Sequence, residues 1–232
     1  MSQGLDHTRI RALCFDIDGT LADTDDALAL RLARWLRPMA SLLPGGDPLR
    51  TARGLLLRSE TPANALVALA DRLGLDEIAG PLLDAFHRSG GQARPHQFLL
   101  IPGLPEALTR LHGSYPLAIV SSRGERGVQA FLEQFSLTPL FRCVASARTC
   151  RRTKPHPAPL RWAAHEMGLP AEACLMVGDT PVDIRAASAA GAQSVGVLCG
   201  FGERAELERA GADLILDATP ALADVLLSAA AG

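Results

Sequence analysis

Two aspartates that follow a short apolar run are the residues of this chain best suited to chemistry. Asp16 and Asp18 stand in the segment DIDGT (16–20), directly after the nearly all-apolar residues 10–15 (IRALCF). Carboxylates held close together repel, which raises the pKa of one of them unless a cation intervenes. The pair therefore predicts a divalent metal site, a shared proton, or both. The alternative is a polar turn that closes a strand, for which Gly19 would allow a sharp change of direction.

The only lysine of the chain, Lys154, lies in a segment that prolines make rigid. It begins the sequence KPHPAPL (154–160), just ahead of a helical pattern. Proline fixes the backbone, so the ammonium is held in a defined place. A compact point charge suits a doubly charged phosphoryl group. We therefore expect Lys154 to bind such a group rather than to be a solvated surface lysine.

Polar residues also follow two later apolar runs. Ser121 follows residues 117–120 (LAIV), and its hydroxyl with the neighbouring amides could hold a phosphate oxygen or simply cap a helix. Asp179 and Asp183 follow the run ACLMV that ends at residue 177. Asp183 has the spacing of a capping-box residue, a structural role that is compatible with support of a metal site.

From residue 97 onward, short apolar runs alternate with helical patterns. Runs that are apolar throughout are typical of strands buried on both faces of a parallel sheet. We therefore predict an α/β fold with a doubly wound parallel sheet. Such sheets bind ligands at the carboxyl ends of their strands, where Asp16 and Asp179 would both project.

Residues 23–96 break this alternation, because they show helical periodicity and no convincing strand. Connections in α/β proteins are usually short, so a segment of this length is better explained as a separate unit. The prediction is an α/β core made of residues 1–22 and 97–232, with a small helical domain of residues 23–96 inserted after the first strand.

Composition excludes several classes of protein. Of 232 residues, 48% are hydrophobic and 21% charged, and the net charge is −2. This balance argues against a disordered chain and provides no basic field for nucleic acid or an anionic membrane. The five cysteines have no C-x-x-C spacing, as expected of buried thiols in a reducing compartment. No signal peptide or membrane span is evident, so we expect a cytoplasmic protein.

Taken together and in this order, the motifs closely resemble the four motifs of the haloacid dehalogenase (HAD) superfamily of phosphohydrolases. The likeness covers nearly the whole chain: D-x-D-G-T after a strand, the hydroxyl of Ser121, Lys154, and G-D-x-x-x-D at residues 178–183. The inserted segment looks like the type 1 cap of that superfamily. The segments KPHPAPL and VGVLCGFGERAEL (195–207) look most like phosphoglycolate phosphatases.

The resemblance implies a Mg²⁺-dependent phosphatase that acts on a small phosphate monoester, phosphoglycolate-like or a sugar phosphate. Asp16 would be the nucleophile that forms an aspartyl-phosphate, and Asp18 the general acid and base. Ser121 and Lys154 would hold the phosphoryl group.

The same resemblance implies the metal ligands. Asp16, Asp179 and the backbone carbonyl of Asp18 would hold Mg²⁺, and Asp183 would support them.

Contacts to the rest of the substrate are expected from arginines and a serine. Arg53 and Arg58 lie in TARGLLLR, which resembles a cap loop that faces the active site in relatives. Ser122 and Arg123 follow the second motif. Two alternatives remain: a phosphosugar mutase of the β-phosphoglucomutase type, which shares this core and cap, and a non-catalytic HAD-like binding protein. The absence of lysine from the inserted segment argues against a phosphonatase, and Asp18 argues against a dehalogenase.

Overall fold

The computed structural model describes residues 4–23, 37, 48, 51 and 98–229. The chain divides into two compact units, one made of Met1–Thr24 and Phe98–Gly232 and the other of Asp25–Gln97. Arg53, Arg58 and most of the segment 23–96 lie outside the described residues. The helical domain expected there therefore stays a prediction.

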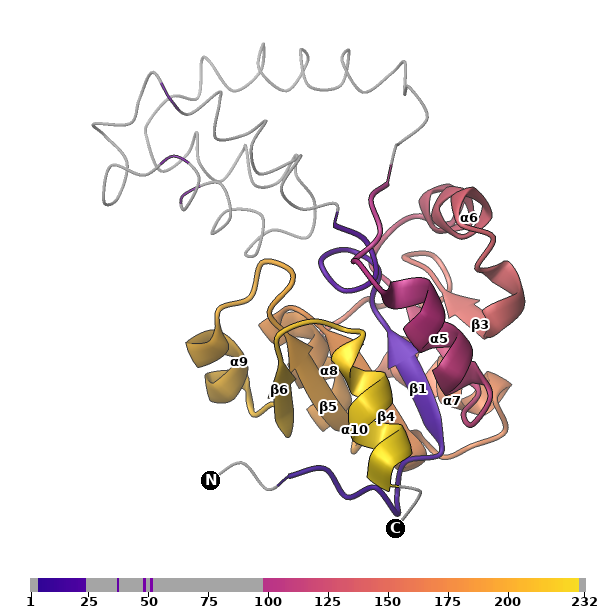
Figure 1. Ribbon diagram of the computed structural model, residues 1–232, viewed down its shortest axis with the longest axis vertical. Helices are drawn as coiled ribbons and strands as arrows, with labels where there is room; N and C mark the ends of the chain where they lie inside the picture. The colour runs from indigo at the N-terminus through magenta and orange to yellow at the C-terminus, as the bar shows by residue number, and fades with distance from the viewer. Residues whose placement is uncertain (1–3, 24–36, 38–47, 49–50, 52–97, 230–232) are drawn as a thin grey trace. The chain divides into compact units, whose positions relative to one another are not determined.

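In the first unit, strands and helices alternate along the chain (Figure 1). The strands are β1 (Ala12–Phe15), β2 (Leu117–Val120), β3 (Phe141–Ala145), β4 (Cys174–Gly178), β5 (Gln193–Val197) and β6 (Leu214–Leu216). The α-helices are α5 (Leu104–His112), α6 (Glu125–Gln134), α7 (Ala158–Glu166), α8 (Pro181–Ala190), α9 (Arg204–Ala210) and α10 (Ala221–Ala229). Short 3₁₀ helices, η3 (Thr138–Leu140) and η4 (Ala171–Ala173), precede β3 and β4.

The strands form one parallel sheet in the order β3-β2-β1-β4-β5-β6. Strand β1 lies between β2 and β4, and Phe15 pairs with Ile119 on one side and Val177 on the other. The predicted doubly wound parallel sheet is confirmed. The chain builds outward from β1 to β3 and then returns to β4 on the other side of β1. The carboxyl ends of β1 and β4 therefore flank the point where open α/β sheets bind ligands.

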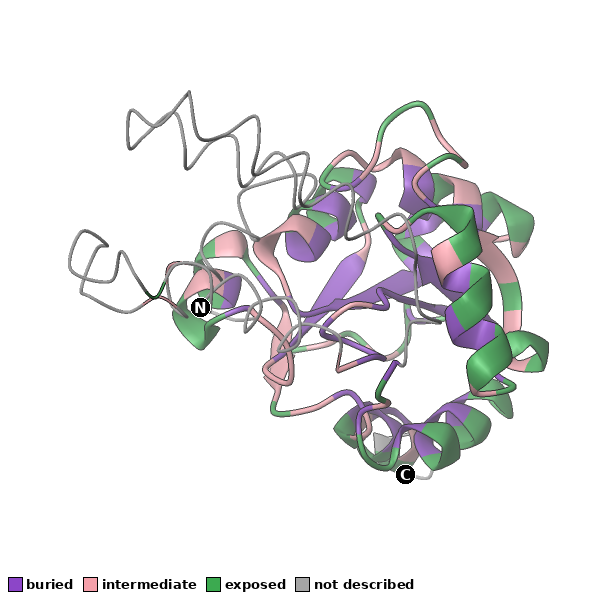
Figure 2. Cartoon of the chain, turned by 90° about the horizontal axis from the view of Figure 1, so that it is seen from above, coloured by how far each residue is buried: buried purple, intermediate pink, exposed green. Residues whose placement is uncertain are grey.

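Each face of the sheet is covered by its own apolar layer. Leu13 and Phe15 belong to a layer of large side chains with α5, α6 and α10. Ala12 and Cys14 point to the opposite face, where smaller side chains pack with α7 and α8. This follows from the alternation of side chains along a strand. The four central strands, β1, β2, β4 and β5, are buried, whereas the edge strands β3 and β6 are mostly half-buried, and the helices combine buried faces with exposed ones (Figure 2).

The chain leaves β1 in a tight turn that places the second aspartate off the strand. The amides of Leu21 and Ala22 donate to the Ile17 carbonyl at 2.9 and 2.8 Å. Gly19 has a φ of 70°, in the left-handed region that favours glycine. Asp18 thus lies in a turn rather than on the strand, and the alternation of strand side chains does not govern its direction.

Candidate active site

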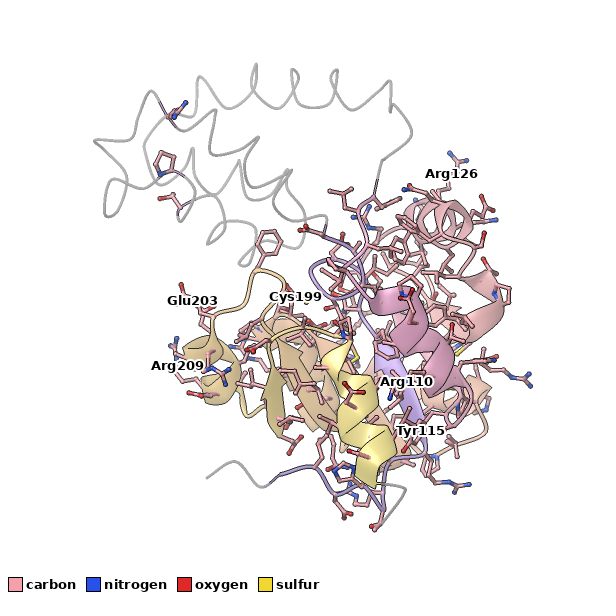
Figure 3. The ribbon with its side chains drawn as sticks, viewed as in Figure 1. Arg110, Tyr115, Arg126, Cys199, Glu203 and Arg209 are labelled. Atoms are coloured by element: carbon pink, nitrogen blue, oxygen red, sulfur yellow. The ribbon has the colours of Figure 1, made fainter. Side chains whose placement is uncertain are left out.

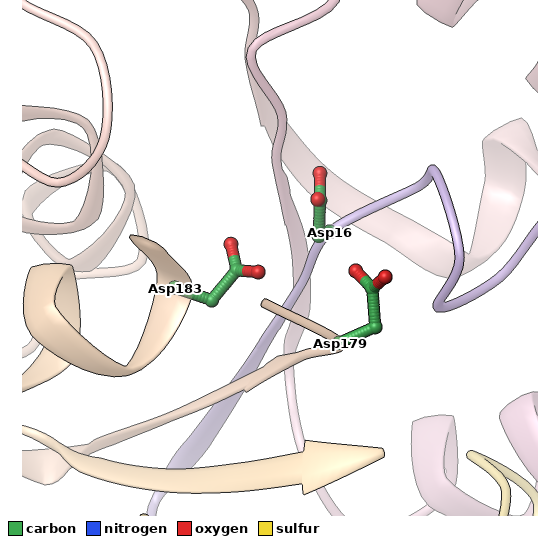
Figure 4. A group of neighbouring side chains, drawn as sticks. All are labelled: Asp16, Asp179 and Asp183. Atoms are coloured by element: carbon green, nitrogen blue, oxygen red, sulfur yellow. The ribbon is translucent and has the colours of Figure 1, made fainter. Parts of the chain in front are cut away.

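Three buried carboxylates converge at the carboxyl ends of β1 and β4. Asp16 directly follows β1, Asp179 directly follows β4, and Asp183 lies in the first turn of α8. One carboxylate oxygen from each residue lies within 4.8 Å of those of the other two (Figure 4). Asp16 is 9% exposed, and Asp179 and Asp183 are fully buried. The expected meeting of Asp16 and Asp179 at this edge is therefore what the structure shows.

Lys154 lies against two of these carboxylates. Its Nζ is 3.0 Å from Asp16 Oδ1 and donates to Asp183 Oδ1 over 2.6 Å. The lysine side chain is 3% exposed, so the sequence-based expectation of a functional rather than a solvated lysine is consistent with its position. Burial disfavours the ammonium, but the two carboxylates outweigh burial and hold the pKa of Lys154 above its usual value.

The pKa values of two of the aspartates show how crowded the site is. Burial, reinforced by the charges of Asp183 and Asp18 and opposed by Lys154, raises the pKa of Asp16 to about 6. Burial and the charges of Asp183 and Asp16 raise the pKa of Asp179 well above its usual range. The ammonium of Lys154 pairs with Asp16 and Asp183, two of the three carboxylates. A divalent cation that prefers oxygen ligands fits this set, because it would offset the negative charge left over.

Asp183 is held by the start of its own helix. The Thr180 N–H and Oγ1–H donate to Asp183 Oδ2 at 3.1 and 2.7 Å, which completes a capping box around α8. Gly178 makes room for this carboxylate, because a Cβ at Gly178 would lie 2.3 Å from Asp183 Cγ. The capping role expected from the sequence coexists with the ion pair to Lys154.

The loop that follows β5, residues 198–203, holds Asp179 in place. The sequence had indicated Asp179 but not its contact with this loop. The Phe201 N–H donates to Asp179 Oδ2 at 2.8 Å. A Cβ at Gly200 would lie 2.2 Å from the same oxygen, and one at Gly202 would lie 1.8 Å from the Asp179 carbonyl oxygen. Thr20 Oγ1 donates to Asp179 Oδ1 over 3.5 Å. The signal was the G-x-G spacing soon after a buried strand, where only glycine permits so close an approach.

The segment after β2 contains three more of the expected residues, Ser121, Ser122 and Arg123. Ser121 is buried, and its Oγ accepts a hydrogen bond from the Arg123 N–H at 3.2 Å, whereas Ser122 is exposed. The Arg123 guanidinium donates two hydrogen bonds to the Asp18 carboxylate, one from Nε to Oδ2 at 2.9 Å and one from Nη2 to Oδ1. The sequence indicated both residues but not their pairing.

Comparison with known proteins agrees with the geometry. The profile of the haloacid dehalogenase-like hydrolases matches residues 13–197. The chain belongs to this family. A phosphoglycolate phosphatase of Aliivibrio fischeri is 32% identical over 213 residues, which cover 90% of this chain and 92% of that one. A phosphoglycolate phosphatase of Photobacterium profundum is 30% identical over 94% of this chain and 96% of its own length.

Solved structures show the same fold. A hydrolase from Pseudomonas syringae has a TM-score of 0.70 and 26% identity, over 94% of this chain and 98% of that chain. A structure described as a putative phosphoglycolate phosphatase from Lactobacillus delbrueckii has a TM-score of 0.73 and 20% identity, over 93% and 98%. The expected class of enzyme, a phosphohydrolase of this family, is therefore confirmed. Within the described residues, we find no helix with the length and apolar character needed to span a bilayer.

Proposed function

We propose that this protein is a Mg²⁺-dependent phosphatase that hydrolyses a small phosphate monoester through an aspartyl-phosphate on Asp16. One observation carries the proposal: the Asp16 carboxylate lies at the carboxyl end of β1, beside Lys154 and close to two further buried carboxylates. A carboxylate attacks a phosphate dianion only when the negative charge around it is offset. This arrangement provides the nucleophile and part of the positive charge in one place.

In the first half of the reaction, Asp16 is the nucleophile. A carboxylate oxygen of Asp16 attacks phosphorus, and the bond from phosphorus to the ester oxygen breaks. Asp18 donates its carboxyl proton to the departing oxygen, which leaves as an alcohol. Lys154 offsets the charge that gathers on the phosphoryl oxygens. The Ser121 hydroxyl and nearby amides accommodate one of those oxygens.

The second half regenerates the enzyme. The Asp18 carboxylate, now without its proton, takes a proton from a water molecule as that water attacks phosphorus. The bond between phosphorus and Asp16 breaks, and inorganic phosphate is released. Asp16 returns to its carboxylate form and Asp18 to its protonated form, so both residues are ready for another turnover.

Asp16, Asp179 and the Asp18 backbone carbonyl would hold Mg²⁺, and Asp183 would support them while keeping its bonds to Lys154 and Thr180. When bound, Mg²⁺ supplies positive charge and polarises the phosphoryl oxygens. The fit rests on the donor set, because all the groups are oxygens and two of the carboxyls have raised pKa values that a divalent cation would relieve.

A small, acidic substrate of the phosphoglycolate type is the class we favour. The two related phosphoglycolate phosphatases, matched over nine-tenths or more of both chains, support this choice. Arg53 and Arg58 are proposed to contact the part of the substrate beyond the phosphoryl group, in the manner of a cap loop. Arg123 is the corresponding candidate among the described residues.

Phosphate release from a panel of esters tests this function. The panel contains phosphoglycolate, p-nitrophenyl phosphate, several sugar phosphates and pyrophosphate, each with and without Mg²⁺. We expect metal-dependent release that Asp16→Asn lowers by more than about 1,000-fold. Asp224→Asn is the matched control, because Asp224 is an exposed aspartate on α10. Turnover retained by Asp16→Asn would overturn the mechanism. Interconversion of sugar phosphates without phosphate release would indicate a mutase. A complete lack of reaction with every ester would indicate a binding protein.

A further inference from the structure

The turn that carries Asp18 accepts a hydrogen bond from a residue just ahead of α10. The Thr219 Oγ1–H donates to the Thr20 carbonyl over 2.5 Å, although the two residues are 199 positions apart. Thr20 is fully buried and Thr219 is 1% exposed. Within the described residues, Thr219 is the donor that satisfies this carbonyl. The bond therefore decides whether a buried acceptor has a partner, and buried polar groups rarely lack one.

Thr219 has the sequence context of a helix cap, yet its hydroxyl bonds to the turn. It precedes Pro220 and then α10, just as Thr180 precedes the proline that begins α8. Thr180 caps its own helix, in a capping box with Asp183. In the part of the chain that the structure describes, no amide of α10 donates to the Thr219 hydroxyl. The two threonines thus share a sequence pattern but differ in what they hold.

The middle of the turn is attached to the rest of the protein through two successive carbonyls. Thr219 holds that of Thr20, and Cys199 Sγ donates to that of Gly19 over 3.4 Å. Cys199 belongs to the loop that follows β5 (Figure 3). The bonds that the turn makes to the Ile17 carbonyl are local, so they keep its shape without attaching it to the sheet. Between its two ends, the turn is therefore positioned by Thr219 and Cys199.

The anchored segment borders on two residues of the site. Asp18 directly precedes Gly19, so the place of its carboxyl follows from where the turn lies. The Thr20 Oγ1–H donates to Asp179 Oδ1 over 3.5 Å, so the residue that Thr219 holds also contacts a proposed metal ligand. These contacts connect the start of α10 to side chains that the mechanism uses.

We propose that Thr219 is a positioning residue: its bond to the Thr20 carbonyl keeps the turn where the Asp18 carboxyl meets the ester oxygen. This inference rests on the proposed phosphatase function, in which Asp18 protonates that oxygen. A general acid acts only within hydrogen-bonding reach of the departing oxygen. Without the Thr219 hydroxyl, the buried Thr20 carbonyl loses its donor, and the turn shifts to recover one. A displacement of about 1 Å at a reacting group can cost about 100-fold in rate.

Esters that differ in their need for an acid distinguish this role from a structural one. p-Nitrophenolate leaves as a stable anion, whereas the alkoxide of glycolate needs a proton as it departs. Thr219→Val removes the hydroxyl and keeps the shape of the side chain. We expect kcat/KM to fall by about 10- to 100-fold for phosphoglycolate and by less than about threefold for p-nitrophenyl phosphate. A purely structural loss lowers the amount of active enzyme and scales both esters equally.

Steady-state kinetics with both esters, at Mg²⁺ concentrations that saturate each variant, tests the inference. Thr219→Ser keeps the hydroxyl and should keep the ratio of the two kcat/KM values within about twofold of the wild type. Thr109→Val is the matched control and should leave the ratio unchanged. Thr109 Oγ1 also donates to a backbone carbonyl, that of Pro105 at 2.8 Å, but on the exposed side of α5.

Circular dichroism checks the folding of each variant. If Thr219→Val does not fold, Cys199→Ala replaces it, because it removes the thiol that holds the Gly19 carbonyl. A thiol is a weak donor, so we expect a smaller change of the ratio in the same direction, of about threefold to tenfold.

The remaining outcomes overturn the inference. An unchanged ratio in Thr219→Val, or in Cys199→Ala where that variant replaces it, means that the turn does not depend on this anchor. An equal fall in Thr219→Ser means that the hydroxyl is not the group that matters. In both cases the wild type still releases phosphate, so the proposed function stands. No phosphate release by the wild type would refute the proposed function and this inference with it.

Discussion

Lys154 Nζ donates to Asp183 Oδ1 over 2.6 Å, although the two residues are 29 positions apart, Lys154 ahead of α7 and Asp183 in the first turn of α8. The same ammonium lies 3.0 Å from Asp16 Oδ1, so one lysine joins the residue after β1 to the first turn of α8. Asp183 in turn caps α8 through Thr180. The cation of the site is therefore part of the framework that positions its carboxylates.

Replacement of Lys154 by Met should destabilise the protein strongly. The substitution leaves buried carboxylates without their internal cation, and breaking a buried ion pair in this way typically costs about 3–5 kcal/mol. We expect urea denaturation of Lys154→Met to show a loss of this size in the free energy of unfolding, with partial recovery in excess Mg²⁺.

Arg110→Met is the control for this experiment. Arg110 pairs with Asp224 at 2.8 Å, but the side chains are 51% and 75% exposed. Such an exposed pair is worth less than about 1 kcal/mol. Equal losses in the two variants would contradict the structural importance assigned to Lys154.

Gly202→Ala should displace the backbone of Asp179 and so disturb the site. Its Cβ would lie 1.8 Å from the Asp179 carbonyl oxygen, a backbone atom that cannot swing aside. Overpacking of this kind costs about 1–3 kcal/mol, and the shift of Asp179 should also weaken Mg²⁺ binding. Thermal unfolding and Mg²⁺ titration measure both effects. Gly4→Ala, where a Cβ meets nothing within 4 Å, should stay within about 0.5 kcal/mol of the wild type.

Mg²⁺ affinity should fall as the pH is lowered through about 6. Burial raises the pKa of Asp16 to about 6, so in the metal-free protein this carboxyl gains a proton below that pH. Mg²⁺ must then displace the proton, which weakens binding by up to about tenfold per pH unit. Calorimetric titrations across this range measure the slope, and buffers of different ionisation enthalpy report the released proton. A flat profile would contradict the assignment of Asp16 as a ligand.

The raised pKa of Asp16 should also make the stability of the metal-free protein fall as the pH rises. The ordinary pKa of this carboxyl is 3.8, so the folded state binds its proton more tightly than the unfolded state does. The contribution of Asp16 to stability is fully present below about pH 4 and is lost as the pH rises through about 6. Denaturant melts in chelator should therefore show a larger drop over this interval for the wild type than for Asp16→Asn. Equal drops would argue against the raised pKa.

Much of the site could be predicted because it depends on where strands end. Asp16 follows β1 and Asp179 follows β4, and parallel strands bring their carboxyl ends to one edge whatever the detailed packing. Runs of apolar residues located those strand ends within a residue or two. The rigid segment around Lys154 marked the lysine for the same site, where it lies 3% exposed.

The contacts of the site that could not be predicted depend on the direction of side chains outside the strands and on loops that fold back onto the site. The strand pattern stops at Phe15, so it did not reveal that Asp18 turns toward Arg123, which follows β2. The approach of Gly200 and Gly202 to Asp179 joins positions about 20 residues apart through a loop with no periodic pattern. Tertiary contacts of this kind leave only a local hint in the sequence.

Identification of the phosphorylated residue during turnover tests the central claim most directly. Rapid quenching with phosphoglycolate and Mg²⁺, followed by peptide mass spectrometry, should find a transient phosphoryl group on the peptide that contains Asp16. The modification should be sensitive to hydroxylamine, as expected of an acyl phosphate, and should be absent from Asp16→Asn. A phosphoryl group on another residue, or steady phosphate release with no phosphorylated enzyme at any quench time, would contradict the account.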